Sequence, residues 1–186
     1  MKRKFKASDI AFAILIVLLL VPQTRKPIQV ALNKVRVHIL SPSAMDVEDQ
    51  FQLSPFDYNV ISLDEAPKSI EIGKGEVTFL SYWATWCPPC IAEMPSIQSL
   101  YADYGEKINF VLLTNEEPDK VKAFLDKKGY KLPVFIPQMN APEALFEKSI
   151  PTNYIIDQNG KIIIKEQGAS DWNSETVRTA LDTLLP

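Results

Sequence analysis

Histidine and cysteine are scarce in this chain of 186 residues, which contains one histidine and two cysteines. A tetrahedral zinc site needs four ligands, and the single histidine, His38, lies far along the sequence from Cys87 and Cys90. A cysteine nucleophile activated by histidine would also need a histidine near the cysteines. The composition therefore argues against a zinc site and against Cys–His catalysis, and we interpret His38 as a solvent-exposed residue.

Basic residues are depleted from most of the chain. Residues 1–40 hold eight lysines and arginines against one acid, a balance of +7, whereas residues 41–186 hold twelve against twenty-two, a balance of −10. An acidic body argues against a nucleic-acid partner, which would require a basic face. A basic N-terminus beside an apolar run is instead typical of a segment directed to a membrane.

Long hydrophobic runs are also rare, and the most extended one is Ile10–Val21, which follows the cations Lys2, Arg3, Lys4 and Lys6. Its twelve residues are fewer than the roughly 17 to 25 that a spanning helix uses. The run is therefore either the core of a cleaved signal peptide or a short retained anchor. The following VPQTRKP lacks the small residues of a cleavage site, so we expect a signal anchor over residues 1–25, with Phe5–Pro22 supplying the length.

The orientation of this anchor follows from its flanking charges. The cations before the apolar run outnumber Arg25 and Lys26 just after it. Positive residues are retained on the cytoplasmic side, so we expect a cytoplasmic N-terminus at a bacterial inner membrane and a periplasmic or otherwise extracytoplasmic body. Both cysteines then lie outside the cytosol, where a structural disulfide is also plausible.

A juxtamembrane amphipathic segment and linker are predicted over residues 26–56. Ile28, Leu32 and Val35 recur at helical spacing, which fits a short helix on the membrane surface equally well as a helix packed on the domain. Residues 41–56 are polar with little periodicity, as expected of a linker.

Residues 57–186 alternate between short apolar runs and helical patterns. Strands are predicted at 58–63, 77–83, 108–113, 133–136, 153–157 and 161–166. Helical periodicity follows at 91–104, 121–125 and 177–184, and an Asn159–Gly160 turn joins the last two strands. The pattern predicts an α/β domain with a central mixed sheet flanked by helices, preceded by an N-terminal strand extension and the membrane-anchor helix.

The stretch WATWCPPC, Trp83–Cys90, contains both cysteines of the chain. The preceding apolar run predicts a buried strand, and proline favours the first helical turn, so Cys87 should lie at a helix N-terminus. Unpaired N–H groups and the helix dipole favour a thiolate there, which predicts an accessible nucleophile at Cys87 and a more buried partner at Cys90. A structural disulfide remains the alternative, but so short a ring constrains the unfolded chain very little.

These residues resemble a known family. WATWCPPC after a strand, Pro95 in the following helix and IPT at Ile150–Thr152 are similar to the TlpA/ResA-like, membrane-anchored branch of the thioredoxin-fold thiol-disulfide oxidoreductases, over about residues 57–186. The resemblance implies that Cys87 attacks, that Cys90 resolves the mixed disulfide, and that the bond before Pro151 is cis.

The same resemblance, with the physics of a free backbone edge, implies a substrate surface. The main chain of Ile150 beside Pro151 can pair with an extended substrate segment as an added strand. The residues assigned to this surface are Trp86, Pro88, Pro89, Ile150 and Pro151. Trp83 is interpreted as a core residue, and Pro95 as a helix kink.

One departure from thioredoxins concerns the proton carrier. Thioredoxins have a buried aspartate on the strand before the motif, where this chain has Ser81. Glu93, three residues after Cys90 on the same helical face, is the candidate base, and the resembling branch has a glutamate there. A desolvated carboxylate could deprotonate Cys90, although a solvated first-turn glutamate is an equal alternative.

The resemblance also implies partners. It implies reduction of disulfides in exported proteins, such as apocytochromes awaiting haem, with electrons from a membrane thiol transporter and no cofactor beyond the Cys87–Cys90 disulfide. A reductase is favoured because no segment is long enough for the helical insertion of the oxidants. Two alternatives are a copper or haem-delivery thiol protein, which would hold Cu(I) on two thiolates, and a thiol peroxidase, for which Ala84 stands where threonine is required.

Overall fold

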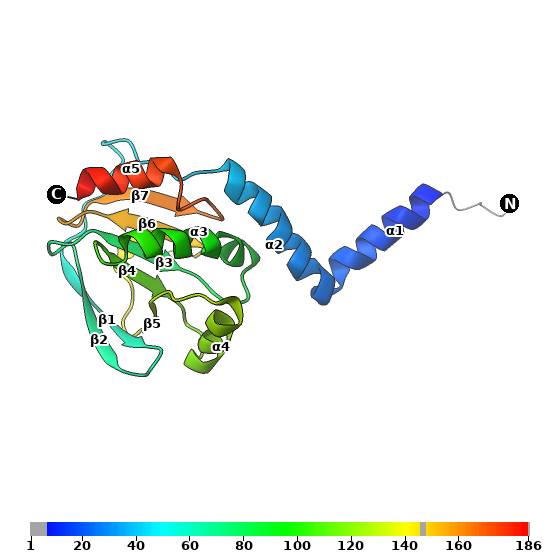
Figure 1. Cartoon of the computed structure of the whole chain (residues 1–186), viewed down its shortest axis with the longest axis horizontal. Coiled ribbons are helices and arrows are strands. Elements are labelled where there is room, and N and C mark those ends of the chain that lie inside the picture. The colour runs from blue at the N-terminus through cyan, green and yellow to red at the C-terminus, as the bar shows by residue number, and fades with distance from the viewer. Residues whose placement is uncertain (1–6, 146–147, 186) are drawn as a thin grey trace.

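The computed structural model describes residues 7–145 and 148–185, and in it a twisted sheet carries helices while two helices extend from the N-terminal side (Figure 1). The strands are β1 (Phe56–Ser62), β2 (Pro67–Ile72), β3 (Thr78–Tyr82), β4 (Asn109–Leu113), β5 (Val134–Pro137), β6 (Thr152–Ile156) and β7 (Ile162–Gln167). The helices are α1 (Ala7–Leu20), α2 (Pro22–Ile39), α3 (Pro88–Tyr104), α4 (Pro118–Lys128), the short 3-10 turn η1 (Glu143–Leu145) and α5 (Glu175–Leu184).

The sheet is mixed, as its sequence pattern predicts. Its strand order is β2-β1-β5-β4-β3-β6-β7, with β3, β4 and β5 parallel and the other pairings antiparallel. Every predicted strand is present, and β2 is an additional edge strand that hairpins back on β1. The thioredoxin-like α/β architecture is therefore confirmed, and the central β3 lies directly before the cysteines.

The hydrophobic core has one part on each face of the sheet. On one face, α3, α4 and α5 cover side chains such as Phe79, Leu112 and Ile155. On the other, Leu80, Val111 and Tyr154 pack under η1 and the irregular segment around Leu53. Because both faces of the sheet are covered, every residue of β6 and all but the last residue of β3 are buried.

Proline begins three of the helices. Pro22, Pro88 and Pro118 occupy the first positions of α2, α3 and α4, where the missing N–H would have no helical partner. α4 ends at Gly129, whose left-handed backbone (φ 70°) closes the helix. These local signals fix where α3 starts, and that start is the position of Cys87.

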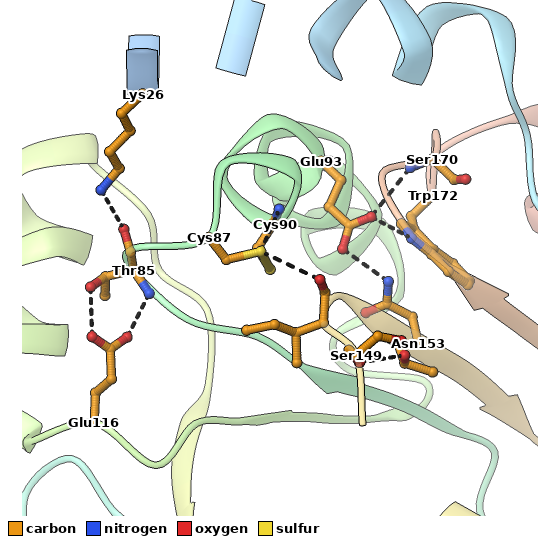
Figure 2. Close-up of a disulfide and its surroundings, with 12 residues drawn as sticks. Lys26, Thr85, Cys87, Cys90, Glu93, Glu116, Ser149, Asn153, Ser170 and Trp172 are labelled. Carbon is orange, nitrogen blue, oxygen red and sulfur yellow. Dashed lines mark hydrogen bonds between the residues drawn. A yellow bond between two sulfur atoms is a disulfide. The ribbon is translucent and has the colours of Figure 1, made fainter. Parts of the chain in front are cut away.

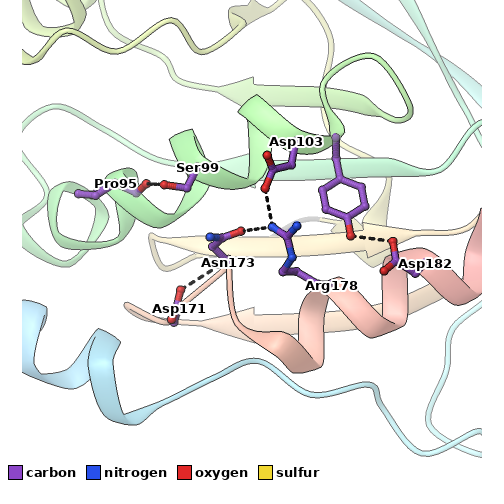
Figure 3. A network of polar contacts seen from close by, with 8 residues as sticks. Pro95, Ser99, Asp103, Asp171, Asn173, Arg178 and Asp182 are labelled. Carbon is purple, nitrogen blue, oxygen red and sulfur yellow. Dashed lines mark hydrogen bonds and ion pairs between the residues drawn. The ribbon is translucent and has the colours of Figure 1, made fainter.

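Polar contacts tie α5 to the C-terminal half of α3 (Figure 3). Arg178 donates to Asp103 at 2.6 Å and to Asn173 at 2.8 Å. The Tyr104 hydroxyl donates to Asp182 at 2.7 Å. The far end of α3 is thus tied to α5.

The predicted membrane-anchor helix is not found in the described part of the chain. α1 has 14 residues, which at about 1.5 Å per residue is shorter than the roughly 30 Å of a bilayer's hydrocarbon core. In residues 7–145 and 148–185, no helix combines the length and the apolar character needed to cross a membrane. The helix is interrupted at Val21, which has an extended backbone, and α2 begins at Pro22. Phe5 and the cations before it lie outside the described residues.

The segment between α2 and the sheet is attached to the domain along much of its length. The N–H of Met45 donates to Ile163, and that of Ile162 donates to Phe51. Gln52 forms a single antiparallel bridge with Lys161. Part of the segment that composition describes as a linker therefore runs beside the β6–β7 hairpin.

Candidate active site

Cys87 lies where a buried strand passes into a helix, as predicted. β3 ends at Tyr82, and Cys87 is the N-cap of α3, with an extended backbone and Pro88 as the first helical residue. The N–H of Cys90 points at Cys87 Sγ at 3.3 Å. Because the first-turn N–H groups have no helical acceptors, this position favours negative charge on the sulfur when the pair is reduced.

Cys87 and Cys90 form a disulfide, with Cα atoms 5.3 Å apart. The expectation that Cys87 is accessible is wrong for this oxidised state, because Cys87 exposes 3% of its surface and Cys90 exposes 1%. Both cysteines belong to the core cluster that contains Trp83, Ala84 and Met94. A visiting sulfur can therefore reach Cys87 only if the groups over it move aside.

One of those groups belongs to the loop before β6. The carbonyl oxygen of Ile150 lies 3.7 Å from Cys87 Sγ (Figure 2). The Ile150–Pro151 bond is cis, as the resemblance implies. The Thr152 hydroxyl donates to Ser149 at 2.8 Å and closes the loop from the other side. The predicted backbone edge therefore does lie beside the disulfide.

The remaining residues of the predicted substrate surface differ in exposure. Trp86 is 58% exposed, and Pro88, Pro89 and Ile150 are partly exposed. Trp83, by contrast, is buried against Phe124, as expected of a core residue. A groove of about 810 Å³ opens beside the disulfide, with Trp86, Ala84, Ile150, Glu116, Met139 and Tyr82 among its lining residues.

Glu93 is buried rather than solvated, which removes the alternative of a first-turn surface glutamate. It exposes 1% of its surface. One carboxylate oxygen accepts from Asn153 Nδ2 at 2.9 Å, and the other accepts from the Ser170 N–H and Trp172 Nε1, each at 3.3 Å (Figure 2). Burial raises the pKa of Glu93 to about 8, against the lowering effect of these hydrogen bonds.

The Glu93 carboxylate lies in a polar environment that the sequence did not indicate, formed by Asn153, Ser170 and Trp172. They lie 60 to 79 residues beyond Glu93 in the chain. Asn153 Oδ1 is buried and has no hydrogen-bond partner in the described structure. An isolated asparagine inside an apolar strand, β6, was the one available signal.

A second network holds the loop before Cys87. The Thr85 N–H and hydroxyl donate to the two carboxylate oxygens of Glu116 at 2.5 and 2.8 Å. Lys120 also donates to Glu116, and Lys26 of α2 donates to the Thr85 carbonyl at 3.1 Å. Burial opposes ionisation of Glu116, but the bonds from Lys120 and Thr85 outweigh it and lower its pKa.

Metal ligands do not cluster in the described part of the protein. Within it, no three His, Cys, Asp or Glu side chains lie close enough together to hold an ion. Pro95 lies inside α3, where its carbonyl accepts from Ser99 at 3.0 Å. Ser81, which stands where thioredoxins have an aspartate, is fully buried.

Comparison with known proteins gives consistent matches. The family model described as Redoxin matches residues 55–184. The chain is 32% identical over 144 residues to the thiol-disulfide oxidoreductase ResA of Bacillus thuringiensis (strain Al Hakam), covering 75% of this chain and 82% of that protein. It is also 32% identical over 110 residues to the thioredoxin-like protein YneN of Bacillus subtilis (strain 168), covering 57% of this chain and 65% of that one.

Solved structures agree on the fold. A protein from Chlorobium tepidum assigned as the thiol:disulfide interchange protein DsbE superposes with a TM-score of 0.59 at 24% identity, covering 74% of this chain and 99% of that one. At this level of identity the likeness shows the thioredoxin-like fold, in which helix α3 of this chain begins at the disulfide. With a buried disulfide at the start of that helix and relatives of this kind, the chain belongs to the Redoxin family, as a TlpA/ResA-like thioredoxin-fold thiol-disulfide oxidoreductase.

Proposed function

We propose that the protein reduces disulfides of exported proteins, with Cys87 as the attacking and Cys90 as the resolving thiol. The observation that carries this proposal is the Cys87–Cys90 disulfide at the N-cap of α3, beside the backbone of Ile150. Helix N-termini favour thiolate, and a strand edge beside the sulfur favours an extended peptide.

The first step forms a mixed disulfide. In the reduced protein, the Cys87 thiolate attacks one sulfur of the substrate disulfide, and the second substrate sulfur leaves as a thiolate that takes up a proton. The substrate segment lies along Ile150 and Pro151, with Trp86, Pro88 and Pro89 against its side chains. Binding of the segment displaces the cover that leaves Cys87 only 3% exposed.

The second step releases the substrate. Cys90 loses its proton and attacks Cys87 Sγ, which expels the remaining substrate thiolate and regenerates the Cys87–Cys90 disulfide. Two electrons have then passed from the dithiol to the substrate. Glu93 is the proton acceptor, because burial raises the pKa of its carboxyl to about 8 and so makes its ionised form a stronger base than an ordinary carboxylate.

The direction of electron flow follows from the supply of reductant. A membrane thiol-electron transporter returns two electrons to the disulfide after each turnover, and apocytochromes awaiting haem are one class of substrate. The N-terminal segment keeps the protein at a bacterial inner membrane, with the catalytic domain on the extracytoplasmic side. The basic N-terminus, the apolar run after it and the absence of a small-residue cleavage site support this location.

The decisive experiment traps the mixed disulfide. Cys90→Ser is expressed in cells, free thiols are blocked with alkylating reagent, and proteins disulfide-bonded to Cys87 are purified and identified. Exported proteins with cysteine pairs should be captured, because without Cys90 the second step cannot occur.

The matched control is Cys87→Ser/Cys90→Ser, which should capture nothing. A Cys90→Ser protein whose Cys87 stays unreacted under the same conditions would contradict the exchange mechanism. If captured partners are disulfide-bonded and become reduced only when Cys90 is present, the reductase direction is supported. If the disulfide form instead oxidises reduced partners, electrons flow in the opposite direction and the reductase proposal is refuted.

A further inference from the structure

Helix α2 has two opposite faces with different surroundings. On its inner face, Val37 packs with Ala92 of α3 and Ala169 in a small buried cluster. Nearer its start, Lys26 donates to the carbonyl of Thr85 at 3.1 Å, in the loop that leads to Cys87. The inner face of α2 is therefore part of the domain.

The outer face carries an apolar stripe that nothing in the described structure covers. Leu32, Val35 and Ile39 are 65%, 58% and 74% exposed. At about 100° per residue, these three side chains fall within one narrow sector, with Ile28 beside them, on the side opposite Val37. Exposed apolar side chains aligned on a helix otherwise anchored to the domain mark an interaction surface.

Charge on α2 identifies the kind of surface. The helix carries four basic residues, Arg25, Lys26, Lys34 and Arg36, and its sequence PQTRKPIQVALNKVRVHI has no acidic residue. Arg25 is exposed, roughly 20° round the helix from Leu32 at the edge of the stripe. The rest of the body is acidic, with twelve basic residues against twenty-two acidic ones in residues 41–186.

The preceding helix also exposes apolar side chains. α1 ends at Leu20 and α2 begins at Pro22, and Val21 between them is an exposed apolar residue. Phe12, Ile14 and Val17 of α1 are exposed as well. An apolar helix joined end to end with a basic amphipathic one has the composition of a chain that enters a lipid surface and then lies along it.

We propose that the outer face of α2, formed by Leu32, Val35 and Ile39, lies on an anionic lipid bilayer. This inference rests on the membrane location put forward above and extends it to a specific surface. The apolar stripe enters the headgroup region, Arg25 at its edge meets the lipid phosphates, and the acidic body is held away from them. The inner face of α2 contacts Thr85 and Ala92. The lipid surface therefore also fixes the orientation of α3, the helix that begins at the disulfide.

The test uses the full-length protein with a fluorescent reporter at single sites. In a Cys87→Ser/Cys90→Ser background, Val35→Cys, Lys34→Cys and Ile14→Cys are each labelled with an environment-sensitive dye. Lys34 is the matched control, since it lies next to Val35 but about 100° round the helix, towards the domain. The labelled proteins are reconstituted in vesicles of equal parts phosphatidylcholine and phosphatidylglycerol, with and without quenching lipids.

The expected result is a blue-shifted emission at position 35 that lipid quenchers reduce at least about twofold more than emission at position 34. The difference should diminish in vesicles of phosphatidylcholine alone. Quenching at position 14 but water-like emission at position 35 would overturn this inference while leaving the membrane location intact. Water-like emission at all three positions would instead refute the membrane location.

A second copy of the chain is the competing occupant of the stripe. It would give a blue shift at position 35 without lipid, increasing with protein concentration, and that outcome also overturns the proposal. Leu32→Ser/Val35→Ser provides an independent variant, because both changes are on exposed positions and leave the inner face untouched. Its oligomeric state should match that of the unaltered protein.

Discussion

The buried carboxylate of Glu93 makes the stability of the oxidised protein depend on pH in an unusual direction. Its pKa is raised from 4.5 to about 8, mainly by burial. Between these values the native state keeps a proton that the unfolded chain has lost. The native state therefore binds more protons, and the free energy of unfolding must fall as pH rises through this range.

The size of the effect follows from the shift in pKa. A difference of roughly 3.5 pH units at 1.36 kcal/mol per unit gives an upper bound of about 5 kcal/mol between pH 4.5 and pH 8. This is a large share of the roughly 5 to 15 kcal/mol that stabilises a typical domain. The nearby charge of Glu166 acts in the same direction, as the smallest of the contributions to the shift.

Glu93→Gln isolates this contribution. The new amide keeps the size of the carboxyl group, and its oxygen can accept from Ser170 and Trp172. Its NH₂ would meet the NH₂ of Asn153, but that side chain can rotate and present Oδ1, which is buried without a partner. The variant should therefore fold. Its free energy of unfolding should differ less from that of the unaltered protein near pH 5 than at pH 9.

The assay is urea unfolding of both proteins from pH 5 to pH 9, with the disulfide intact so that the thiols do not titrate. The quantity compared is the difference in unfolding free energy at each pH, which cancels groups common to both. We expect the free energy of unfolding of the variant to increase relative to that of the unaltered protein as pH rises. Above pH 8 the variant should be the more stable of the two. A difference that is constant with pH would refute the reasoning, because it would mean that Glu93 is not protonated in the folded state.

Three further predictions concern residues around this centre and the hairpin loops. Gly73→Ala should lower the free energy of unfolding by about 1 to 3 kcal/mol more than Gly129→Ala, because both have φ of 70° but only Gly73 has backbone within 2.7 Å of a new Cβ. Glu116→Gln should cost on the order of 1 kcal/mol at pH 7 in urea unfolding, and the deficit should shrink below pH 4, where acid protonates the carboxylate that Thr85 and its neighbours stabilise. Trp172→Phe removes one donor that lowers the pKa of the Glu93 carboxyl, so in urea unfolding the fall in unfolding free energy should continue to a higher pH than in the unaltered protein; an unchanged upper end of this pH range would contradict this.

Local sequence signals predicted the position of the disulfide but not its cover. An apolar strand followed by Cys-Pro-Pro-Cys is sufficient to put Cys87 at a helix start, because each signal acts within a few residues. The carbonyl of Ile150, 63 residues away, lies over the sulfur only once β6 pairs with β3. Burial of Cys87 is thus a tertiary property, and periodicity carries no information about it.

Two further differences have the same origin. β2 was not predicted because PKSIEI is an exposed edge strand, and its Lys and Glu side chains hide the alternation. On α2, the spacing of Ile28, Leu32 and Val35 indicated one apolar face but left open whether it meets lipid or protein. The helix packs on the domain by its other side, through Val37. Packing on protein therefore applies to the Val37 face, and contact with lipid is proposed for the opposite face.

The residues around the redox centre are held from five separate parts of the chain. Thr85 is bonded by Lys26 of α2 and by Glu116 after β4, Cys87 meets the loop before Pro151, and Glu93 is held from β6 and the turn before α5. The residues of the exchange chemistry lie within positions 87–93, whereas their geometry depends on contacts that close long loops. None of these contacts is a backbone hydrogen bond between strands, so we expect loss of one of them to loosen the connection between β3 and α3 before it affects the sheet. Variants of these distant partners should therefore alter the reactivity of Cys87 before they measurably alter the fold.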